Sequence, residues 1–528
     1  MQATYIPYSQ TNAFSGLVLD YLAGQPDLAA FYAERPDLEG LGKTIEKRNF
    51  GGNRQTLVKV LKNQYSNLKT HQAVANNIEL LLREETFTVT TGHQLNLFTG
   101  PLYFIYKIVT AINLALELKI AYPEQNFVPV YWMATEDHDF AEINHVQVEE
   151  ELISWIQQGN GATGRLSTKT VAAAVTAYKG YLGLSANGRK LGSLVEDAYL
   201  GNSNLADATR QLVNSLFEKY GLVIINADEP ELKAQFAGIA ADDIVHRHSA
   251  AHIAASSEAL ASCGYGAQVH GREINFFYLR DHLRERIVFE DNVYKVNKTD
   301  ITFSESGLLA EINEHPDRFS PNVVMRPLYQ EIVLPNIAYI GGGAEIAYWM
   351  QLKANFDFYK TDFPVLILRN SALLIDPRSK QNLFRLGISP DEIFANEETL
   401  VTNWVHNNTR NQLFLADESR EIQALFDRIK LQAFKIDKSL SESADAAKTK
   451  TLHLLGNLEK KLLRAEKRNH EISLQQIKNV KARLFPGGSL QERVLNLAPM
   501  YVNYGEDFLS TLIERFQPLG QQFTIITP

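Results

Sequence analysis

The chain has 528 residues, of which 45% are hydrophobic and 21% are charged, and its formal net charge is −9. This length predicts roughly two to four domains, and the composition is that of a globular protein. The acidic balance argues against a large nucleic-acid-binding surface.

Further features bear on where such a chain works. The N-terminus lacks the basic start and apolar core of a signal peptide, and no run of about 18 apolar residues predicts a membrane span. The one cysteine, Cys263, excludes an internal disulfide and suits a reducing compartment. We therefore expect a cytoplasmic protein that binds neither membranes nor nucleic acid, with Cys263 as a structural thiol.

Residues 1–85 are predicted to form a helical lead-in that packs on the core. Residues 87–145 then follow the order strand, polar turn, helix, strand, polar turn. Phe87–Thr91 and Phe127–Ala134 are the strands, and a helix beginning at Pro101 lies between them. Such βαβ units build parallel sheets, which bind ligands at the carboxyl ends of their strands.

The turn after the first strand carries His93, Gln94 and Asn96 and ends at a helix N-terminus near Gly100. Free backbone N–H groups and the helix dipole favour an anion there. We interpret His93 as a ligand-facing imidazole that donates a hydrogen bond to a phosphate or to a developing charge. A core or capping histidine is the alternative.

The turn after the second strand, Glu136–Asp139, packs three acids and a histidine into four residues. Burying so many titratable groups is costly without a ligand or a cation. The acids are interpreted as holding an amine or sugar hydroxyls; a divalent-cation site and helix capping are the alternatives. Because adjacent residues cannot all face one ion, and no second His/Asp cluster has a standard metal spacing, we predict no metal.

Two insertions interrupt the core. Residues 150–203 are irregular, and they precede a helix and a third buried strand, Leu222–Asn226. Residues 232–321 contain short aromatic and β-branched runs separated by turn-forming residues, which predicts an antiparallel meander. We expect this meander to form a lid or a substrate wall.

The core resumes at Asn322 and includes Gly341–Gly343 between an apolar run and a helix candidate, which favours either a phosphate-binding turn or a plain tight turn. Pro364–Arg369 is a further buried strand. Single basic residues more often form surface pairs than bind a ligand. The candidates for anion contact are Arg326, Lys353, Arg378 and Arg493.

Residues 389–485 are predicted to form two long antiparallel helices, a coiled-coil hairpin, with one apolar seam inside and a spare face for a dimer. Capping boxes at Ser389–Glu392 and Ser489–Glu492 begin two of the predicted helices. Residues 486–528 return to the core. The predicted fold class is therefore α/β, with a parallel core over residues 86–388.

Five blocks of this sequence resemble the cysteine-adding family of bacillithiol biosynthesis, BshC, and the similarity covers essentially the whole chain. The blocks are TGHQLNLFTGPLYFIYK (91–107), VPVYWMATEDHDFAEINH (128–145), VMRPLYQE (324–331), LPNIAYIGGGAEIAYWMQL (334–352) and LFPGGSLQERVL (484–495). The resemblance implies a Rossmann-like core related to class I nucleotidyl transferases, with a coiled coil that mediates a homodimer.

The resemblance also implies a ligase that adds L-cysteine to the amine of glucosaminyl-malate in the last step of bacillithiol biosynthesis, with a pocket for ATP or ADP and no metal. Catalytic roles would fall to His93, Glu136, Asp137 and His138. Substrate-binding roles would fall to Gln94, Asn96, Gly100, Tyr103, Lys107, Asp139, Arg326, Tyr339, Gly342 and Glu345. Nucleotide-binding roles would fall to Gln491, Arg493, Tyr501 and Tyr504.

One mechanism consistent with this resemblance adenylates the cysteine carboxyl, with the helix N-terminus near Gly100 and His93 stabilising the phosphate. An acid of the Glu136–Asp139 turn would hold the amine and accept its proton. Arg326 and Lys107 are candidates for the malyl carboxylates. Two alternatives are a metal-dependent hydrolase acting on an amino-sugar conjugate and a non-catalytic scaffold built on the hairpin.

Overall fold

The computed structural model describes residues 1–528, and a five-stranded parallel sheet of order β13-β12-β2-β3-β6 lies at its centre. Its strands are β2 (Thr86–His93), β3 (Asn126–Met133), β6 (Val223–Asn226), β12 (Asn336–Gly341) and β13 (Val365–Leu368). These strands are buried on both faces, which is why most of them read as apolar runs in the sequence, whereas β2 also buries four threonines. The predicted α/β class with a parallel core is confirmed.

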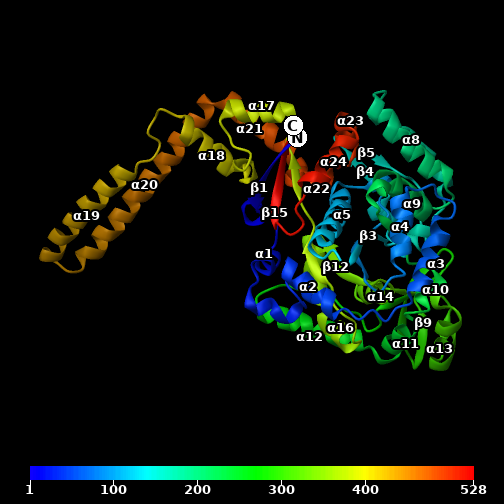
Figure 1. Cartoon of the computed structure of the whole chain (residues 1–528). Helices are drawn as coiled ribbons and strands as arrows, with labels where there is room; N and C mark the ends of the chain where they lie inside the picture. Colours follow the sequence, from blue (N-terminus) through cyan, green and yellow to red (C-terminus); the bar gives the residue numbers. More distant parts are fainter.

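Helices cover both faces of this sheet (Figure 1). On one face, α2 (Leu38–Lys47) and α5 (Tyr103–Ala121) pack apolar side chains against β2, β12 and β13. On the other face, α14 (Arg326–Val333) places the Tyr329 ring 5.4 Å from the Trp132 ring. Two further helices contact the edge strand β6, namely α3 (Arg54–Tyr65) and α4 (Gln72–Leu80).

The two ends of the chain meet in a second sheet, and they lie side by side in Figure 1. There β15 (Gln522–Thr527) pairs antiparallel with β1 (Gln2–Pro7) and parallel with β14 (Ala372–Leu374). The predicted helical lead-in is therefore wrong for the first residues, although α1 (Gly16–Ala23) and later helices follow. The partner of β1 lies at the far end of the chain, where no local pattern indicates it.

The first insertion is more regular than the sequence predicts. After short α6 (Phe140–Ile143), it contains a hairpin of β4 (His145–Val148) and β5 (Glu151–Ser154). Two helices follow, α7 (Ala172–Leu182) and α8 (Ala186–Gly201), and the helix predicted after the insertion is α9 (Leu205–Phe217). Gly183 ends α7 with a φ of 67°, and the Ser185 hydroxyl caps α8, so the turn-forming residues mark helix ends.

The second insertion confirms the predicted meander. Its antiparallel sheet has the order β10-β9-β8-β7-β11. The strands are β7 (Phe276–Arg280), β8 (Leu283–Glu290), β9 (Val293–Val296), β10 (Thr302–Phe303) and β11 (Phe319–Pro321). The surrounding helices are α10 (Pro230–Lys233), α11 (Ala237–His246), α12 (His248–Ser262) and α13 (Glu305–Glu314).

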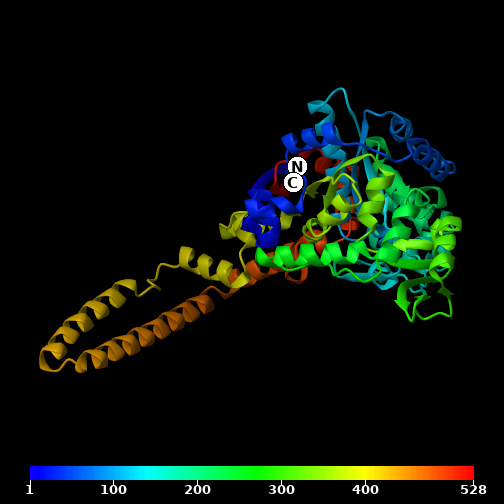
Figure 2. The same cartoon turned by 90° about the horizontal axis from the view of Figure 1, so that it is seen from below.

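The predicted hairpin projects from the body as a long arm in Figures 1 and 2. Its two helices, α19 (Ala416–Ile436) and α20 (Leu440–Asn469), pack along each other, and α21 (Glu471–Leu484) returns the chain to the body. Two more helices lie at its base, α17 (Pro377–Leu386) and α18 (Glu397–Asn408). No helix of the structure combines the length and apolar character that crossing a bilayer requires.

At both predicted capping boxes the structure differs from the prediction. Ser389 and Glu392 do bond to each other, but only a short 3-10 turn follows. At Ser489 no capping bond forms, and α22 (Gln491–Val494) has four residues instead of running on toward Leu497. The remaining helices are α15 (Gly343–Met350), α16 (Lys353–Phe358), α23 (Ala498–Tyr504) and α24 (Glu506–Arg515).

Candidate functional site

The turns that follow β2 and β3 meet at one edge of the central sheet. These strands are parallel neighbours, with His93 opposite Met133. Beyond the strand ends, the side-chain amide of Gln94 donates to Asp137 Oδ2 at 2.7 Å. The two polar turns predicted from sequence therefore form a single surface at the carboxyl end of the sheet.

Two adjoining cavities open on this surface. Cavity A has a volume of about 410 Å³ and lies under the meander, next to Asp137 and His138. Cavity B has a volume of about 340 Å³ and lies between β2, α5 and α15, next to His93. Both cavities are lined by Trp132, Ala134, Val323 and Arg326. Two ligands could therefore lie side by side, in contact around Arg326.

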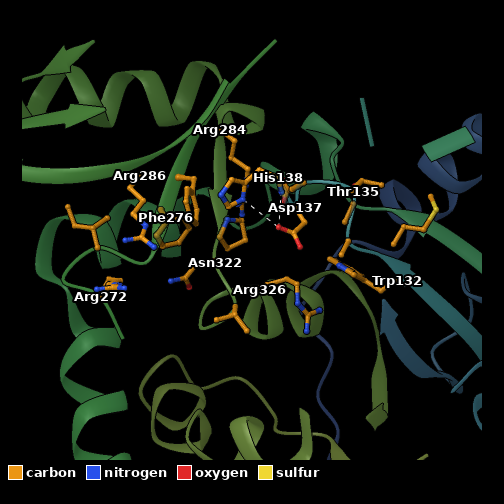
Figure 3. Close-up of a pocket in the computed structure, with 18 of the residues that line it drawn as sticks. Trp132, Thr135, Asp137, His138, Arg272, Phe276, Arg284, Arg286, Asn322 and Arg326 are labelled. Atoms are coloured by element: carbon orange, nitrogen blue, oxygen red, sulfur yellow. Dashed lines mark hydrogen bonds and ion pairs between the residues drawn. The ribbon is translucent and has the colours of Figure 1, made fainter. Parts of the chain in front are cut away.

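Cavity A is rich in arginine (Figure 3). Its guanidinium groups belong to Arg272, Arg284, Arg286 and Arg326. None of these four guanidinium groups forms an ion pair, since no carboxylate oxygen lies within 4.0 Å of any of them. A cluster of cations without paired acids creates a positive potential, which attracts an anionic ligand.

Arg284 is the buried member of this cluster and links the meander to the β3 turn. Its guanidinium donates to His138 Nδ1 at 2.8 Å and to Ser320 Oγ at 3.2 Å, and it lies 3.9 Å from the centre of the Phe277 ring. Because a guanidinium group can only donate, His138 Nδ1 is the acceptor of this bond, which leaves Nε2 as the ring atom that can donate to a ligand.

Asp137 is ionised in this setting. Burial raises the pKa of its carboxyl group, but hydrogen bonds from the backbone N–H of His138 and from the Gln94 amide, together with the charge of Arg284, outweigh burial and hold the pKa below its ordinary value. Asp137 therefore keeps its negative charge at neutral pH and can accept hydrogen bonds from an amine or a hydroxyl group in cavity A.

Glu136 has a structural partner rather than a free face. It forms a buried ion pair with Lys233 of α10, which also lies 3.2 Å from Asp228 at the end of β6. Burial raises the pKa of Glu136, and Lys233 offsets this only in part. Glu136 is therefore less suited to the predicted catalytic role than Asp137, because its carboxylate already pairs with the Lys233 ammonium group.

Cavity B contains a second buried ion pair. Lys107 pairs with Glu345 and donates to the carbonyl oxygen of Gly92 at 2.9 Å. Glu345 also accepts from Tyr339 Oη at 2.8 Å. Burial raises the pKa of Glu345, but the charge of Lys107 lowers it by more, so the pKa lies below its ordinary value. Tyr103, Gln94 and Arg326 also line the cavity, so six predicted substrate-binding residues meet here.

His93 also lines cavity B, in a buried and aromatic environment. Its ring lies 5.1 Å from the Phe104 ring and 5.3 Å from the Tyr103 ring, and its Nε2 has no hydrogen-bond partner. Burial, and then the charges of Lys107 and Arg369, hold the pKa of His93 well below its usual range. The imidazole is therefore neutral and can offer a phosphate a hydrogen bond but no charge.

Four predicted substrate-binding residues line neither cavity A nor cavity B. Asn96 and Gly100 are buried outside both cavities, where Asn496 Nδ2 donates to the Gly100 carbonyl at 2.7 Å. Asp139 caps α6, and Gly342 caps α15 by donating its N–H to Glu345 at 2.8 Å. Helix α5 begins at Tyr103, not at Pro101, and the preceding N–H, from Leu102, bonds to Leu495. The anion site predicted near Gly100 is therefore wrong, because the C-terminal segment covers it.

Half of the predicted nucleotide-binding residues share a cavity. Gln491 and Tyr504 line cavity C, of about 730 Å³, whereas Arg493 and Tyr501 do not. Both groups of the Gln491 amide are used by the backbone of Leu374. Cavity C carries more acids than bases: its carboxylates are those of Glu149, Glu150, Glu151 and Asp376, and its cation is Arg483.

The sequence predicts the meander as a wall but not the residues through which it acts. Arg272, Arg284 and Arg286 were missed, because more than 120 residues separate them from the turns they face. The only sequence signal for these arginines was the presence of basic residues among the aromatic residues of the predicted strands. Lys233 was missed for the same reason, since its carboxylate partners Glu136 and Asp228 come from two other segments.

The chain is similar to known proteins along its whole length. The family described as bacillithiol biosynthesis BshC has an N-terminal Rossmann-like domain that matches residues 1–370 and a C-terminal coiled-coil domain that matches residues 372–528. A Flavobacterium psychrophilum protein named "Putative cysteine ligase BshC" is 46% identical and covers 100% of this chain and 99% of its own length. Proteins of the same name from Flavobacterium johnsoniae (45% identical; 100% of each chain) and Christiangramia forsetii (40%; 100% and 99%) also match.

Proposed function

This chain belongs to the bacillithiol biosynthesis BshC family, and we propose from that membership that it is a cytoplasmic ligase joining L-cysteine to the amine of glucosaminyl-malate. The product would be bacillithiol, and the reaction would be the last step of its synthesis. Two adjoining cavities with different charge support a reaction between two small substrates. The observation that carries the proposal is the arginine cluster of cavity A.

Cavity A suits the malyl part of the sugar conjugate. Malate contributes two carboxylates, and a guanidinium group can hold a carboxylate through two parallel hydrogen bonds. Arg272 and Arg286 are exposed at the cavity and free of acidic partners, so they can turn toward a ligand. Asp137, on the opposite side in Figure 3, would then lie near the glucosamine amine and accept its hydrogen bond.

Cavity B suits cysteine. Lys107 and Glu345 pair with each other, and a free amino acid would insert its carboxylate and ammonium group into this pair, beside the more exposed Glu345. Arg326 lines both cavities, so a cysteine carboxyl near it would also face the amine in cavity A. The aromatic rings of Tyr103 and Trp132 would shield the reacting groups from water.

An amide forms from a carboxylate only if an oxygen is converted into a leaving group. In the proposed sequence the cysteine carboxylate attacks the α-phosphorus of ATP and releases pyrophosphate. The sugar amine then attacks the carboxyl carbon, loses a proton and releases AMP. This step needs the ATP phosphates beside the cysteine carboxyl in cavity B, where the His93 imidazole can donate a hydrogen bond to them. Cavity C, with Gln491 and Tyr504 in its wall, shares no lining residue with cavity B, and we propose it as a separate adenine-nucleotide site.

The experiment measures product by mass spectrometry with purified protein, cysteine, glucosaminyl-malate and ATP·Mg²⁺. We expect Arg286→Ala to raise KM for glucosaminyl-malate about tenfold or more, since a lost charged hydrogen bond costs about 1.5–3 kcal/mol, while KM for cysteine changes little. Arg378→Ala, at an exposed arginine outside all three cavities, is the control. Equal effects on both substrates, or no effect, would contradict this assignment, and product without ATP would remove the adenylation step.

A further inference from the structure

A group of metal-ligand side chains lies at the junction of α11 and α12, away from cavities A, B and C. Asp242, His246 and His248 offer one oxygen and two nitrogens that all lie within 4.8 Å of one another. His246 Nδ1 is 3.1 Å from Asp242 Oδ1, and His248 Nε2 is 3.8 Å from Asp242 Oδ2. A tetrahedral ion with bonds of about 2.0–2.1 Å needs ligand atoms roughly 3.3 Å apart, so small side-chain movements would complete the site.

The backbone brings these residues together through one unusual conformation. Asp242 and His246 are four residues apart and share a face of α11. Arg247 then has a φ of 64°, a left-handed value that non-glycine residues rarely adopt, and it turns the chain so that His248 returns to the same carboxylate. The Arg247 guanidinium pairs with Glu273 at 3.1 Å rather than with Asp242, so its charge is already matched.

Neighbouring side chains already orient two of the three candidate ligands. The hydroxyl of Tyr359 donates to Asp242 Oδ2 at 3.1 Å. The Phe358 ring lies 4.4 Å from the His248 ring and limits its rotation. Outer contacts of this kind fix ligand geometry in metal sites and contribute to affinity.

We propose that Asp242, His246 and His248 bind a divalent d-block cation, with Zn²⁺ as the best match and a fourth position open to solvent. Two imidazoles and one carboxylate suit zinc, whereas Mg²⁺ and Ca²⁺ prefer oxygen ligands alone. The three side chains are 39%, 58% and 34% exposed, so an ion reaches them without unfolding of the protein. The spacing Asp-x3-His-x-His matches no standard motif, which is why the sequence predicts no metal.

The bound ion would brace the wall of cavity A from outside. Tyr359 also lies 3.3 Å from Asp243, whose carboxylate accepts from the Ser249 hydroxyl at 2.7 Å. Asn275 Nδ2 donates to the Ser249 hydroxyl, and Asn275 Oδ1 accepts from Asn322 Nδ2 at 2.8 Å. Asn322 lines cavity A, so a hydrogen-bonded series connects the junction to the proposed substrate wall.

The test titrates EDTA-treated, full-length protein with Zn²⁺ in competition with a chromogenic chelator. We expect the wild type to bind one ion that His246→Ala and His248→Ala both lose. Tyr359→Phe should lower the affinity for Zn²⁺ about 10–100-fold, because it removes the hydroxyl that holds the Asp242 carboxylate. His252→Ala is the matched control, since His252 lies on the same helix and against the same Phe358 ring but outside the cluster.

Since His246 is exposed and His248 is only half-buried, their variants should keep the wild-type near-ultraviolet circular dichroism, which verifies the fold. Wild-type protein that takes up no Zn²⁺ would overturn the proposal. So would a stoichiometry that stays the same in both His variants, because the ion would then bind elsewhere. Neither outcome depends on catalytic activity, so the result is independent of the proposed ligase function.

Discussion

Burial outweighs ion pairing at Glu331, on α14 next to the central sheet. Its carboxylate accepts from Asn336 Nδ2 at 2.8 Å and from Gln330 Nε2 at 3.0 Å, and it lies 3.5 Å from the Arg48 guanidinium. Burial raises the pKa of Glu331 to about 7, although Arg48 and the two amides lower it. Between pH 4.5 and about 7, Glu331 of the folded protein therefore keeps a proton that the unfolded chain has already released.

This difference makes stability depend on pH in a defined direction. The ordinary pKa of the glutamate is 4.5, so between pH 4.5 and about 7 the native state binds more protons than the unfolded state at this residue. Stability then falls as pH rises through this range, and the loss is complete above about pH 7. We expect the unfolding free energy of the wild type, minus that of Glu331→Gln, to decrease from pH 5 to pH 8 in urea titrations.

Glu124→Gln, at an exposed glutamate with no ion pair, is the control, and its difference from the wild type should not follow this trend. A wild-type minus Glu331→Gln difference that stays constant or increases with pH would contradict the assignment. Subtracting the two proteins removes the contribution of the other titratable groups, which both share.

At this scale the sequence predicts residues that sit within one local pattern. Gln94, Asp137 and Lys107 belong to the βαβ unit, and the register of β2 and β3 brings them to the same edge of the sheet. Arg284 could not be predicted, because its contact with His138 joins residues 146 positions apart. Asn96 and Gly100 were assigned to substrate because the sequence does not show that both are buried or that Asn496 bonds to the Gly100 carbonyl.

At the scale of elements, a buried ion pair fastens the C-terminal segment to the core. Arg369, which follows β13, donates to Glu492 Oε1 of α22 at 2.6 Å, and the N–H of Ala372 donates to Oε2 at 2.9 Å. The side chains of Arg369 and Glu492 are 5% and 0% exposed. Because Glu492 makes these contacts, it does not cap the helix predicted at Ser489.

We expect Glu492→Ala to destabilise the protein by about 3–5 kcal/mol, because it leaves a buried guanidinium without its carboxylate. Glu492→Gln should cost less, since it keeps an oxygen for the Ala372 N–H. Urea unfolding measures both. Asp417→Ala, which breaks an exposed pair with Arg420, is the comparison and should change little. Equal costs for Glu492→Ala and Asp417→Ala would contradict the role of this pair.

Long elements are predicted from sequence better than the contacts that join them. The hairpin extends over two helices with repeated apolar positions, so its pattern is strong and local. The capping pattern at Ser489 has four residues, and one distant arginine is enough to override it. The strand β1 has no predicted partner for a similar reason, because β15 lies some 520 residues away.

At the scale of the whole molecule, the arm exposes apolar side chains that the hairpin itself does not cover. Its internal seam half-buries Ile422, Phe426 and Leu455. Outside this seam, Leu425 is 46% exposed and Leu458 is 47% exposed. Exposed apolar side chains that line a projecting element favour contact with another protein surface.

We propose that the arm pairs two copies of this chain, as the family resemblance implies. Sedimentation equilibrium of the wild type should then give twice the chain mass of 59.5 kDa. Leu425→Glu combined with Leu458→Glu should return the mass toward that of one chain, because each substitution would bury a carboxylate in an apolar contact. Lys460→Glu, at an exposed polar position of α20, introduces the same charged side chain and should leave the dimer intact. A wild type of single-chain mass would contradict the pairing, and a dimer that the paired leucine variant keeps would place the contact away from this surface.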